Sequence, residues 1–381
     1  MSIDIDLSDI VLNNEPQDFQ ILNPTVVDKL PDDEKKPFDH SPGFIQWLKD
    51  NNVSFLISSY KTANIYFLGS ITDPRDGQDK ISLWMSNFNR PMGIHATKDT
   101  VWISSSGNIW KYKNIGAKPD TTNVGEFDAC FIPQSAYFSN DCDSHDLCVD
   151  STGNVYYVSA TFCCICQPSE THSFKVFWKP SWISKITSED RCHLNGMCCR
   201  DGKPRYVTAV SLSDSKGAWR NHRVGKGVVY DIVEDKLACT GLSMPHSPRF
   251  FNNKLWVLDA GTGWLGYVDF EKKELKKTLW LPGYLRGMSF VGDKYMVVGS
   301  SESRHEGTFQ GLPLGEELKK RGLEAICGFF VIDMKTWVIV HTFQFHGKSN
   351  EIYDVVAVEG VKRGQLIELN DPDGKTLYKV K

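Results

Sequence analysis

Three histidines could act together, because imidazole suits both proton transfer and transition-metal binding near neutral pH. His145 and His246 each begin a short phrase that recurs along the chain, and His193 lies two residues before Asn195, which begins another. Two or three imidazoles with nearby carboxylate or amide oxygens suit Zn, Mn, Fe or Cu, whereas calcium prefers an all-oxygen shell. We therefore predict that His145, His193 and His246 are ligands of a divalent transition metal.

Two other interpretations of these histidines remain open. In the first, they hydrogen-bond to side chains of neighbouring structural units and have no chemical role. In the second, they carry out acid–base catalysis without a metal. The residue types favour metal binding by at least two of the three.

Further polar residues recur with the histidines. Arg286 and Tyr353 supply a permanent cation and a phenol, which could hold an anionic substrate and transfer a proton, or could form a structural hydrogen-bonded pair. Asp146 directly follows His145. It could act in catalysis, support a metal ligand or accept a hydrogen bond at a strand end. We predict Tyr353, Arg286 and Asp146 as catalytic residues.

Four residues are predicted to bind substrate: Arg191, Arg249, Asn195 and Tyr284. The two arginines lie within three residues of a candidate histidine and could clamp a carboxylate or a phosphate. Arginines in such positions also brace loops, so a structural role is the alternative.

Six of the eleven cysteines fall in one stretch: Cys163, Cys164, Cys166, Cys192, Cys198 and Cys199. They could complete a zinc site, but the second half lacks the two-residue gap of a zinc knuckle, so free, half-buried thiols are favoured. Cys192, beside His193, could be an activated nucleophile, although alternation along a strand points adjacent side chains to opposite faces.

The elements that must position these residues are β-strands. From residue 53 onward, runs of alternating apolar and polar residues rich in Val, Ile, Trp and Tyr are separated by turn dipeptides. A helical pattern is found only at 41–50 and 315–325.

One phrase recurs before successive groups of strands. It begins at six anchor residues: Met92, His145, Asn195, His246, Arg286 and Tyr353. The anchors are separated by 53, 50, 51, 40 and 67 residues, and the long last interval contains an insert at 301–325. A four-stranded propeller blade spans about 40–50 residues, so the period indicates one blade per anchor.

We therefore predict an all-β fold, a six-bladed β-propeller over 41–367, in which the C-terminal segment completes the blade begun at residue 53 and closes the ring. The first strand of each blade lines the central channel, so the six anchors should form one ring there. If these strands are regular, Asp146 and Asp354 face away from that ring. A β-sandwich with an appended domain is the structural alternative.

Charge restricts the expected partners and location. The 381 residues carry a net charge of −4, which gives no general attraction to nucleic acid or to a membrane. Residues 1–40 hold ten acidic residues and three lysines, so we expect an extended or disordered leader there, and a short tail at 368–381. We recognise no signal peptide and no apolar run of about 18 residues, and we expect a cytoplasmic protein with reduced thiols.

Several segments resemble a family of uncharacterised, mostly bacterial proteins with a six-bladed propeller pattern: HDLCVDSTGNVYYVS, RCHLNGMCCRDGKPRYVTAVS, GLSMPHSPRF, GYLRGMSF and EIYDVV. The similarity covers roughly 41–365 and supplies no activity. It implies that the family signature comprises His145, Asp146, Arg191, Cys192, His193, Asn195, Gly196, His246, Ser247, Pro248, Arg249, Arg286 and Tyr353.

The blade phrase resembles, more distantly, NHL-repeat and gluconolactonase-type propellers. Those lactonases hold calcium or another divalent metal with acidic and amide side chains, and the histidine-rich ring departs from that pattern. Propeller polysaccharide lyases, some of which use His, Tyr and Arg or a His-bound metal, match the residue types.

We therefore expect a metal-dependent hydrolase or lyase that acts on a small anionic or polyhydroxylated substrate in the channel. The metal would polarise a carbonyl or activate water, Arg286 would pair with the substrate's negative charge, and Tyr353 would transfer a proton. The alternative is a non-catalytic propeller that binds a ligand or a protein partner through its loops, the insert or the acidic leader.

Overall fold

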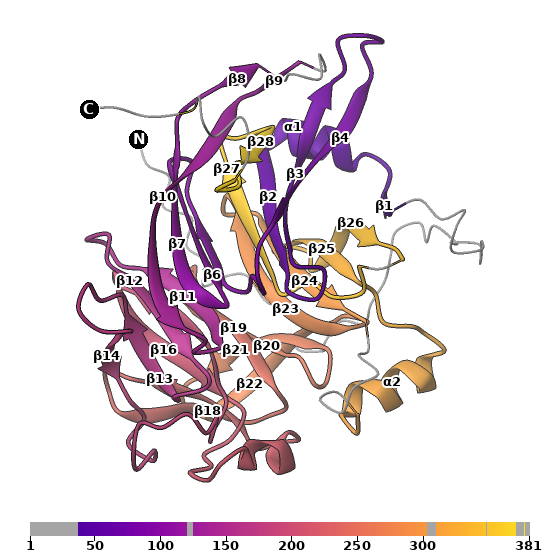
Figure 1. Cartoon of the computed structure of the whole chain (residues 1–381). Coiled ribbons are helices and arrows are strands. Elements are labelled where there is room, and N and C mark those ends of the chain that lie inside the picture. Colours follow the sequence, from indigo (N-terminus) through magenta and orange to yellow (C-terminus); the bar gives the residue numbers. More distant parts are fainter. Residues whose placement is uncertain (1–36, 120–124, 303–309, 348, 371–376, 378–381) are drawn as a thin grey trace, which may run out of the picture.

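The computed structural model describes residues 37–119, 125–302, 310–347, 349–370 and 377. These residues form six large sheets and one two-stranded sheet. Figure 1 shows the large sheets following one another as blades along the colour gradient of the sequence. The predicted all-β, six-bladed propeller is confirmed.

Each blade runs from an inner strand at the channel to an outer strand at the rim. Blade I contains β27 (Asp354–Glu359), β2 (Val53–Ser59), β3 (Asn64–Thr72) and β4 (Asp79–Asn87). Blade II contains β5 (Ile94–Ala96), β6 (Thr100–Ser105), β7 (Gly107–Asn114), β10 (Ala129–Asn140) and β28 (Gly364–Leu366). Blade III contains β11 (Ser144–Val149), β12 (Val155–Ser159), β13 (Cys164–Gln167) and β14 (Lys175–Trp178).

The remaining blades follow the same order. Blade IV contains β15 (Leu194–Arg200), β16 (Lys203–Ala209), β17 (Gly227–Asp231) and β18 (Lys236–Leu242). Blade V contains β19 (Pro245–Phe251), β20 (Lys254–Asp259), β21 (Trp264–Asp269) and β22 (Glu274–Trp280). Blade VI contains β23 (Tyr284–Val291), β24 (Tyr295–Ser301), β25 (Gly328–Asp333), β26 (Val338–Phe345) and β1 (Phe38–His40).

Short elements decorate the blades. They are β8 (Lys118–Pro119), β9 (Glu126–Phe127), the 3-10 helix Ala218–His222, α1 (Phe44–Asp50) and α2 (Pro313–Arg321). The two α-helices overlap the two ranges with a helical pattern. α2 begins with Pro313, whose fixed φ suits a first helical turn, and ends at Gly322, whose φ of 65° is the left-handed conformation of a helix C-cap.

The C-terminal segment closes the ring as predicted. β27 pairs antiparallel with β2, from Asp354 opposite Ser58 to Glu359 opposite Val53, and Figure 1 shows the yellow strand beside the indigo one. β28 then pairs in parallel with β10 of blade II. The last strands therefore join blades I and II and cover edges that would otherwise be exposed.

The ends of the chain differ in part from expectation. Phe38–His40 form β1, which pairs with β26, so the last residues of the predicted leader belong to blade VI. Residues 1–36, most of the predicted tail and residues 303–309 of the insert lie outside the described residues. The described part of the insert packs Leu314 and Leu318 of α2 against a buried cluster that contains Trp219 and Trp280.

The inner strands form a closed cycle of contacts from β27 through β5, β11, β15, β19 and β23 back to β27. One position per blade forms a level of close contact, which we call the waist: Asp354, Gly93, Asp146, Gly196, Ser247 and Gly287, in order around the channel. Glycine thus alternates with a polar residue.

The waist glycines are needed because neighbouring backbones come very close. A Cβ on Gly93 would lie 2.7 Å from the Cα of Asp146, and one on Gly196 would lie 2.5 Å from the Cδ of Pro248. The polar waist residues bridge the other three gaps between blades. Each of them accepts a hydrogen bond from a backbone N–H of the next blade: Asp354 from Ile94 (3.0 Å), Asp146 from Met197 (3.0 Å) and Ser247 from Gly287 (2.9 Å).

The expected outward direction of Asp146 and Asp354 is wrong. Both line the same small cavity as His145 and Tyr353. In β11 the register with β12 shifts between Ser144 and Leu147, and β15, β19 and β23 have shifts at the corresponding positions. Such irregularities break strict alternation in these four strands, so successive residues can face the channel. Tyr353 precedes β27, which begins at Asp354, so strand alternation does not apply to this pair.

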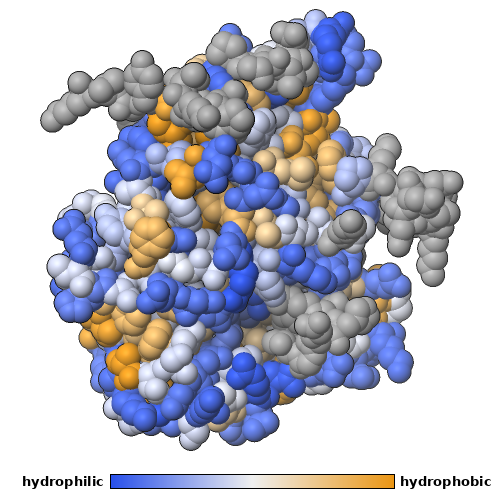
Figure 2. All heavy atoms as spheres, in the orientation of Figure 1, coloured by the Kyte–Doolittle hydropathy of each residue, from blue (hydrophilic) through white to orange (hydrophobic). Residues whose placement is uncertain are grey.

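The apolar core lies between blades. Among the described residues, buried clusters join blades VI and I, I and II, II and III, III and IV, IV and V, and V and VI. On the face shown in Figure 2, hydrophilic residues predominate and apolar ones form separate patches. Neither described α-helix has the length and apolar character needed to cross a bilayer.

The waist packing predicts a large difference between two glycine substitutions. Gly93→Ala forces a Cβ against the backbone of the neighbouring blade, and overpacking of this kind costs about 1–3 kcal/mol or more. Gly315→Ala, in α2, meets nothing within 4 Å and should be neutral or stabilising by up to about 1 kcal/mol. Denaturant unfolding of both variants measures the difference, and equal stabilities would contradict the waist.

Candidate functional site

The waist divides the channel into two ends. At the first end, anchors from blades I and III to VI come together: Tyr353, His145, Asn195, His246 and Arg286. At the second end lies a pocket of about 320 Å³. The predicted ring is therefore formed by these five side chains, whereas Met92 contributes its carbonyl, which accepts a hydrogen bond from Ser58.

A chain of hydrogen bonds crosses three blades at the first end. His145 donates from Nδ1 to Oδ1 of Asn195 (3.0 Å), and Nδ2 of Asn195 donates to Nε2 of His246 (2.9 Å). His246 donates from Nδ1 to the carbonyl of Met244 (2.7 Å). The other nitrogen of His145, Nε2, donates to Oδ2 of Asp143 (3.0 Å).

This chain determines the protonation of both histidines. A carbonyl only accepts, so Nδ1 of His246 carries hydrogen and Nε2 of the neutral ring must accept. Asn195 therefore turns its NH₂ toward His246 and its oxygen toward His145. Because His145 faces an oxygen acceptor at each nitrogen, only the doubly protonated imidazolium satisfies both.

The electrostatics of the chain agree with this assignment. Burial, assisted by the charge of Arg286, lowers the pKa of His246 well below its ordinary value. Burial alone would raise the pKa of Asp143, but His145, His193 and Arg90 outweigh it and hold that pKa below its ordinary value. A neutral His246 and an ionised Asp143 beside His145 follow.

His193 forms a second histidine–carboxylate pair beside the first. Its Nδ1 donates to Oδ1 of Asp190 (3.0 Å), which also accepts from Trp219 through Oδ2 (2.6 Å). The imidazole stacks on Trp219 at 4.0 Å and meets the ring of His145 edge-on at 4.8 Å. Burial lowers the pKa of His193, and Nε2 has no hydrogen-bond partner within the described ranges. A neutral His193 is thus an oriented base.

Tyr353 and Arg286 complete this end of the channel. The ring of Tyr353 meets that of His145 edge-on at 5.6 Å, and the guanidinium of Arg286 lies 4.8 Å from the Tyr353 centroid. Burial raises the pKa of Tyr353 well above its ordinary value. Tyr353 therefore stays a phenol, which can donate a proton.

Arg249 occupies the centre of the waist. Its Nη1 donates to Oδ2 of Asp146 (2.9 Å) and to the carbonyls of Met197 and Pro248. Burial raises the pKa of Asp354 to about 7, against the opposing charge of Arg249. Asp146 and Arg249 thus join blades III, IV and V through these hydrogen bonds.

The cavity at the first end is small. Its volume is about 10 Å³, enough for roughly one water molecule. It is lined by His145, Asp146, Asn195, Gly196, His246, Ser247, Arg249, Tyr353 and Asp354.

Two predicted substrate-binding residues are not brought into the ring. Arg191 donates to Glu189 (2.8 Å) and Asp214 (2.6 Å), so it braces loops. Tyr284 is buried in the apolar cluster with Trp219 and Trp280. A role for either in substrate binding stays a prediction.

Sequence reasoning missed four residues with clear roles here: Asp143, Asp190, Trp219 and Met244. The two aspartates precede His145 by two residues and His193 by three. An acidic residue just before each histidine is a signal that could have been found. Trp219 is distant in sequence from Asp190, and Met244 acts through its main-chain carbonyl, so neither contact leaves such a signal in the sequence.

The three histidines do not fit a metal centre as arranged. Their imidazoles are close, but His145 and His246 each have both nitrogens hydrogen-bonded. Within the described ranges, no group of three or more His, Cys, Asp or Glu side chains is placed to hold a metal ion. The transition metal stays a prediction.

The cysteine-rich stretch separates into distinct thiol pairs. Cys163 accepts from the N–H of Cys192 (3.4 Å), whereas Cys164 contacts Cys166 (3.5 Å). Cys199 contacts Cys148 on the neighbouring blade (2.9 Å). None of the eleven cysteines, all of which lie in the described ranges, forms a disulfide.

The fold and the site geometry together define the class of protein: an all-β propeller with a histidine cluster at one end of its channel. The chain belongs to the family described as Domain of unknown function (DUF4915), which matches residues 42–367. The family resemblance seen in the sequence is thereby confirmed. No curated protein matches the chain.

Solved propellers resemble the chain at low identity. A putative gluconolactonase is 10% identical over 71% of this chain and 90% of its own, with a TM-score of 0.38. Virginiamycin B lyase from Staphylococcus aureus is 8% identical over 78% and 96%, with a TM-score of 0.37. A luciferin-regenerating enzyme is 11% identical over 83% and 96%, with a TM-score of 0.37. These likenesses concern the fold.

Asn195→Leu tests the hydrogen-bond chain. The variant leaves the buried Nδ1–H of His145 and the Nε2 of His246 without partners, and each unsatisfied group costs about 1–3 kcal/mol. We expect the free energy of unfolding to fall by about 2–5 kcal/mol. The matched Asn89→Leu variant changes an exposed side chain and should be nearly neutral. A loss no larger than that of the control would contradict the hydrogen-bond chain.

Asp354→Asn tests the waist through pH. Between roughly pH 4 and 7 the folded protein holds a proton on Asp354 that the unfolded chain has released, so this group's contribution to stability declines as pH rises through that window. Relative to the variant, which cannot titrate there, the wild type should lose on the order of 1 kcal/mol per pH unit. Denaturant midpoints at several pH values measure the slope, and parallel profiles would refute the assignment.

Proposed function

We propose that the first end of the channel is an acid–base catalytic site for a small anionic molecule, and that elimination of the lyase type is the reaction its groups suit best. The observation that carries this proposal is the pairing of a neutral, oriented His193 with a protonated His145 at 4.8 Å between ring centroids. Neighbouring titratable groups with opposite protonation are the usual basis for assigning a base and an acid.

Each group has a defined task. Asp190 holds the proton on Nδ1 of His193, so that Nε2 is the base. Tyr353 stays protonated and is the proton donor. His145 and Arg286 are cations that both contact the Tyr353 ring, and they stabilise negative charge that develops near the phenol.

In the proposed step, Nε2 of His193 takes the proton from the carbon next to a substrate carboxylate. The electron pair of that C–H bond forms a C=C bond, and the oxygen on the adjacent carbon leaves with the proton of Tyr353. Water returns the proton from His193 to Tyr353, so the protein is unchanged. The products are an unsaturated acid and an alcohol or water.

The substrate class follows from the charges and the size of the site. The cations favour a carboxylate, and the cavity beside His145 and Tyr353, which has room for about one water molecule, receives no more than the leaving oxygen. We therefore propose hydroxy acids or sugar acids with a leaving oxygen one carbon from the acidic C–H. The predicted transition metal has no task in this step, and elemental analysis of purified protein tests for it.

The decisive experiment compares His193→Gln with His172→Gln in the full chain. Protein is incubated with a panel of hydroxy acids, uronates and aldonolactones, and the new C=C bond is followed by ultraviolet absorbance. We expect kcat to fall about 10²–10⁴-fold in the first variant, the usual contribution of a general base. His172 is exposed and its ring hydrogen-bonds to its loop neighbour Thr171, so its loss should change nothing.

The pH profile gives a further check. Because burial lowers the pKa of His193, the acid limb of kcat/KM should lie below the ordinary histidine value. Full activity in His193→Gln, or turnover of lactones alone, would overturn the lyase assignment. The absence of turnover across the panel would favour the non-catalytic alternative.

A further inference from the structure

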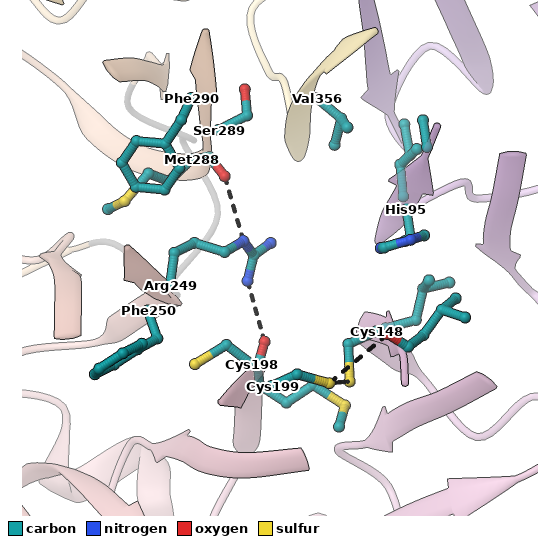
Figure 3. Close-up of a pocket in the computed structure, with 15 residues that line it drawn as sticks. His95, Cys148, Cys198, Cys199, Arg249, Phe250, Met288, Ser289, Phe290 and Val356 are labelled. Carbon is teal, nitrogen blue, oxygen red and sulfur yellow. Dashed lines mark hydrogen bonds between the residues drawn. The ribbon is translucent and has the colours of Figure 1, made fainter. Parts of the chain in front are cut away.

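The second end of the channel holds a separate pocket, on the other side of the waist from the site described above. Its volume is about 320 Å³, within the usual range for small-molecule sites. The wall is mostly apolar, with Arg249 at the waist, His95 opposite and three thiols, from Cys148, Cys198 and Cys199 (Figure 3). Burial and the charge of Arg249 lower the pKa of His95 to about 4, so it adds no charge.

Two of these thiols are in direct contact across neighbouring blades. The Sγ atoms of Cys148, on β11, and Cys199, on β15, lie 2.9 Å apart, and Figure 3 shows both at the pocket wall. Cys199 packs against the cluster between blades III and IV that contains Cys148, whereas Cys198 belongs to the cluster between blades IV and V. Successive side chains of β15 thus point to opposite neighbouring blades, and this alternation places Cys199 beside Cys148.

The pair differs from the other close thiols in its access to solvent. Cys199 is partly exposed and lines the pocket, so a small molecule can reach its sulfur. Cys164 and Cys166 are fully buried and lie on one strand. Cys163 and Cys192 are also buried and do not line this pocket.

We propose that Cys148 and Cys199 form a redox modification site, in which a small disulfide of the glutathione type enters the pocket and converts the two thiols into an inter-blade disulfide. This proposal is independent of the acid–base function.

The exchange proceeds in two steps. The Cys199 thiolate attacks one sulfur of the small disulfide, forms a mixed disulfide and releases one thiol. Cys148 then loses its proton to water and attacks the sulfur of Cys199, and the second small thiol leaves. Two protein thiols are oxidised and one small disulfide is reduced to two thiols. The contact with Cys199, with burial, raises the pKa of Cys148, which makes Cys148 the resolving thiol.

The disulfide would connect two strands that also carry residues of the first end of the channel. β11 carries His145 and Asp146 as well as Cys148, and β15 carries Asn195 as well as Cys199. Oxidation at the second end would therefore fix the relative position of the two strands that supply the first half of the hydrogen-bond chain.

Intact mass and non-reducing peptide mapping test the proposal on the full chain after treatment with oxidised glutathione. We expect loss of two hydrogens, one cross-link between Cys148 and Cys199, and no lasting adduct. Cys148→Ser should trap glutathione on Cys199, because the resolving thiol is missing. Cys199→Ser should show neither the cross-link nor an adduct at Cys148.

Cys198→Ser is the matched control, because Cys198 lines the same pocket and is adjacent in sequence. It should keep the cross-link. Differential alkylation of wild-type protein before and after oxidation identifies the same pair if a variant fails to fold. A cross-link that depends on Cys198, a lasting wild-type adduct, or no reaction of the native protein would each overturn the proposal.

Discussion

The close approach of six inner strands at the waist is the constraint on which the rest of the structure depends. Glycine alternates with Asp or Ser around the channel, so three gaps are closed by direct backbone contact and three by a side chain that accepts a neighbouring N–H. Buried carboxylates are costly unless they are paired, and Arg249 supplies the charge that Asp146 requires. The waist is therefore both a structural clamp and a barrier across the channel.

This barrier explains why the two ends of the channel have different chemistry. On one side the strand ends carry His145, Asn195, His246 and Tyr353, which share hydrogen bonds and ring contacts. On the other side the same strands carry apolar residues and thiols around a larger pocket. Each inner strand passes through the waist, so the same strand contributes residues to both ends of the channel.

Much of the architecture could be predicted from the sequence, because a repeated sequence phrase indicates a repeated structural unit and its length indicates the kind of unit. The anchor period gave six blades, and equivalent positions in equivalent blades must meet at the channel, which placed His145, Asn195 and His246 together. The direction of Asp146 was wrong because a one-residue bulge leaves no clear mark in the pattern. Arg191 and Arg249 are alike in sequence, yet one pairs with loop acids and the other reaches the waist. Only the positions of their carboxylate partners distinguish them.

The metal hypothesis rested on residue type alone, and the hydrogen-bond partners alter how those residues are interpreted. Asn195 makes His145 and His246 chemically unequal, because one amide offers an acceptor to the first and a donor to the second.

Nitrogen-15 NMR of histidine-labelled wild-type protein at neutral pH tests this inequality of His145 and His246 most directly. The account predicts both nitrogens protonated in His145, and neutral rings protonated on Nδ1 in His193 and His246. A neutral His145, or a His246 protonated on Nε2, would contradict it.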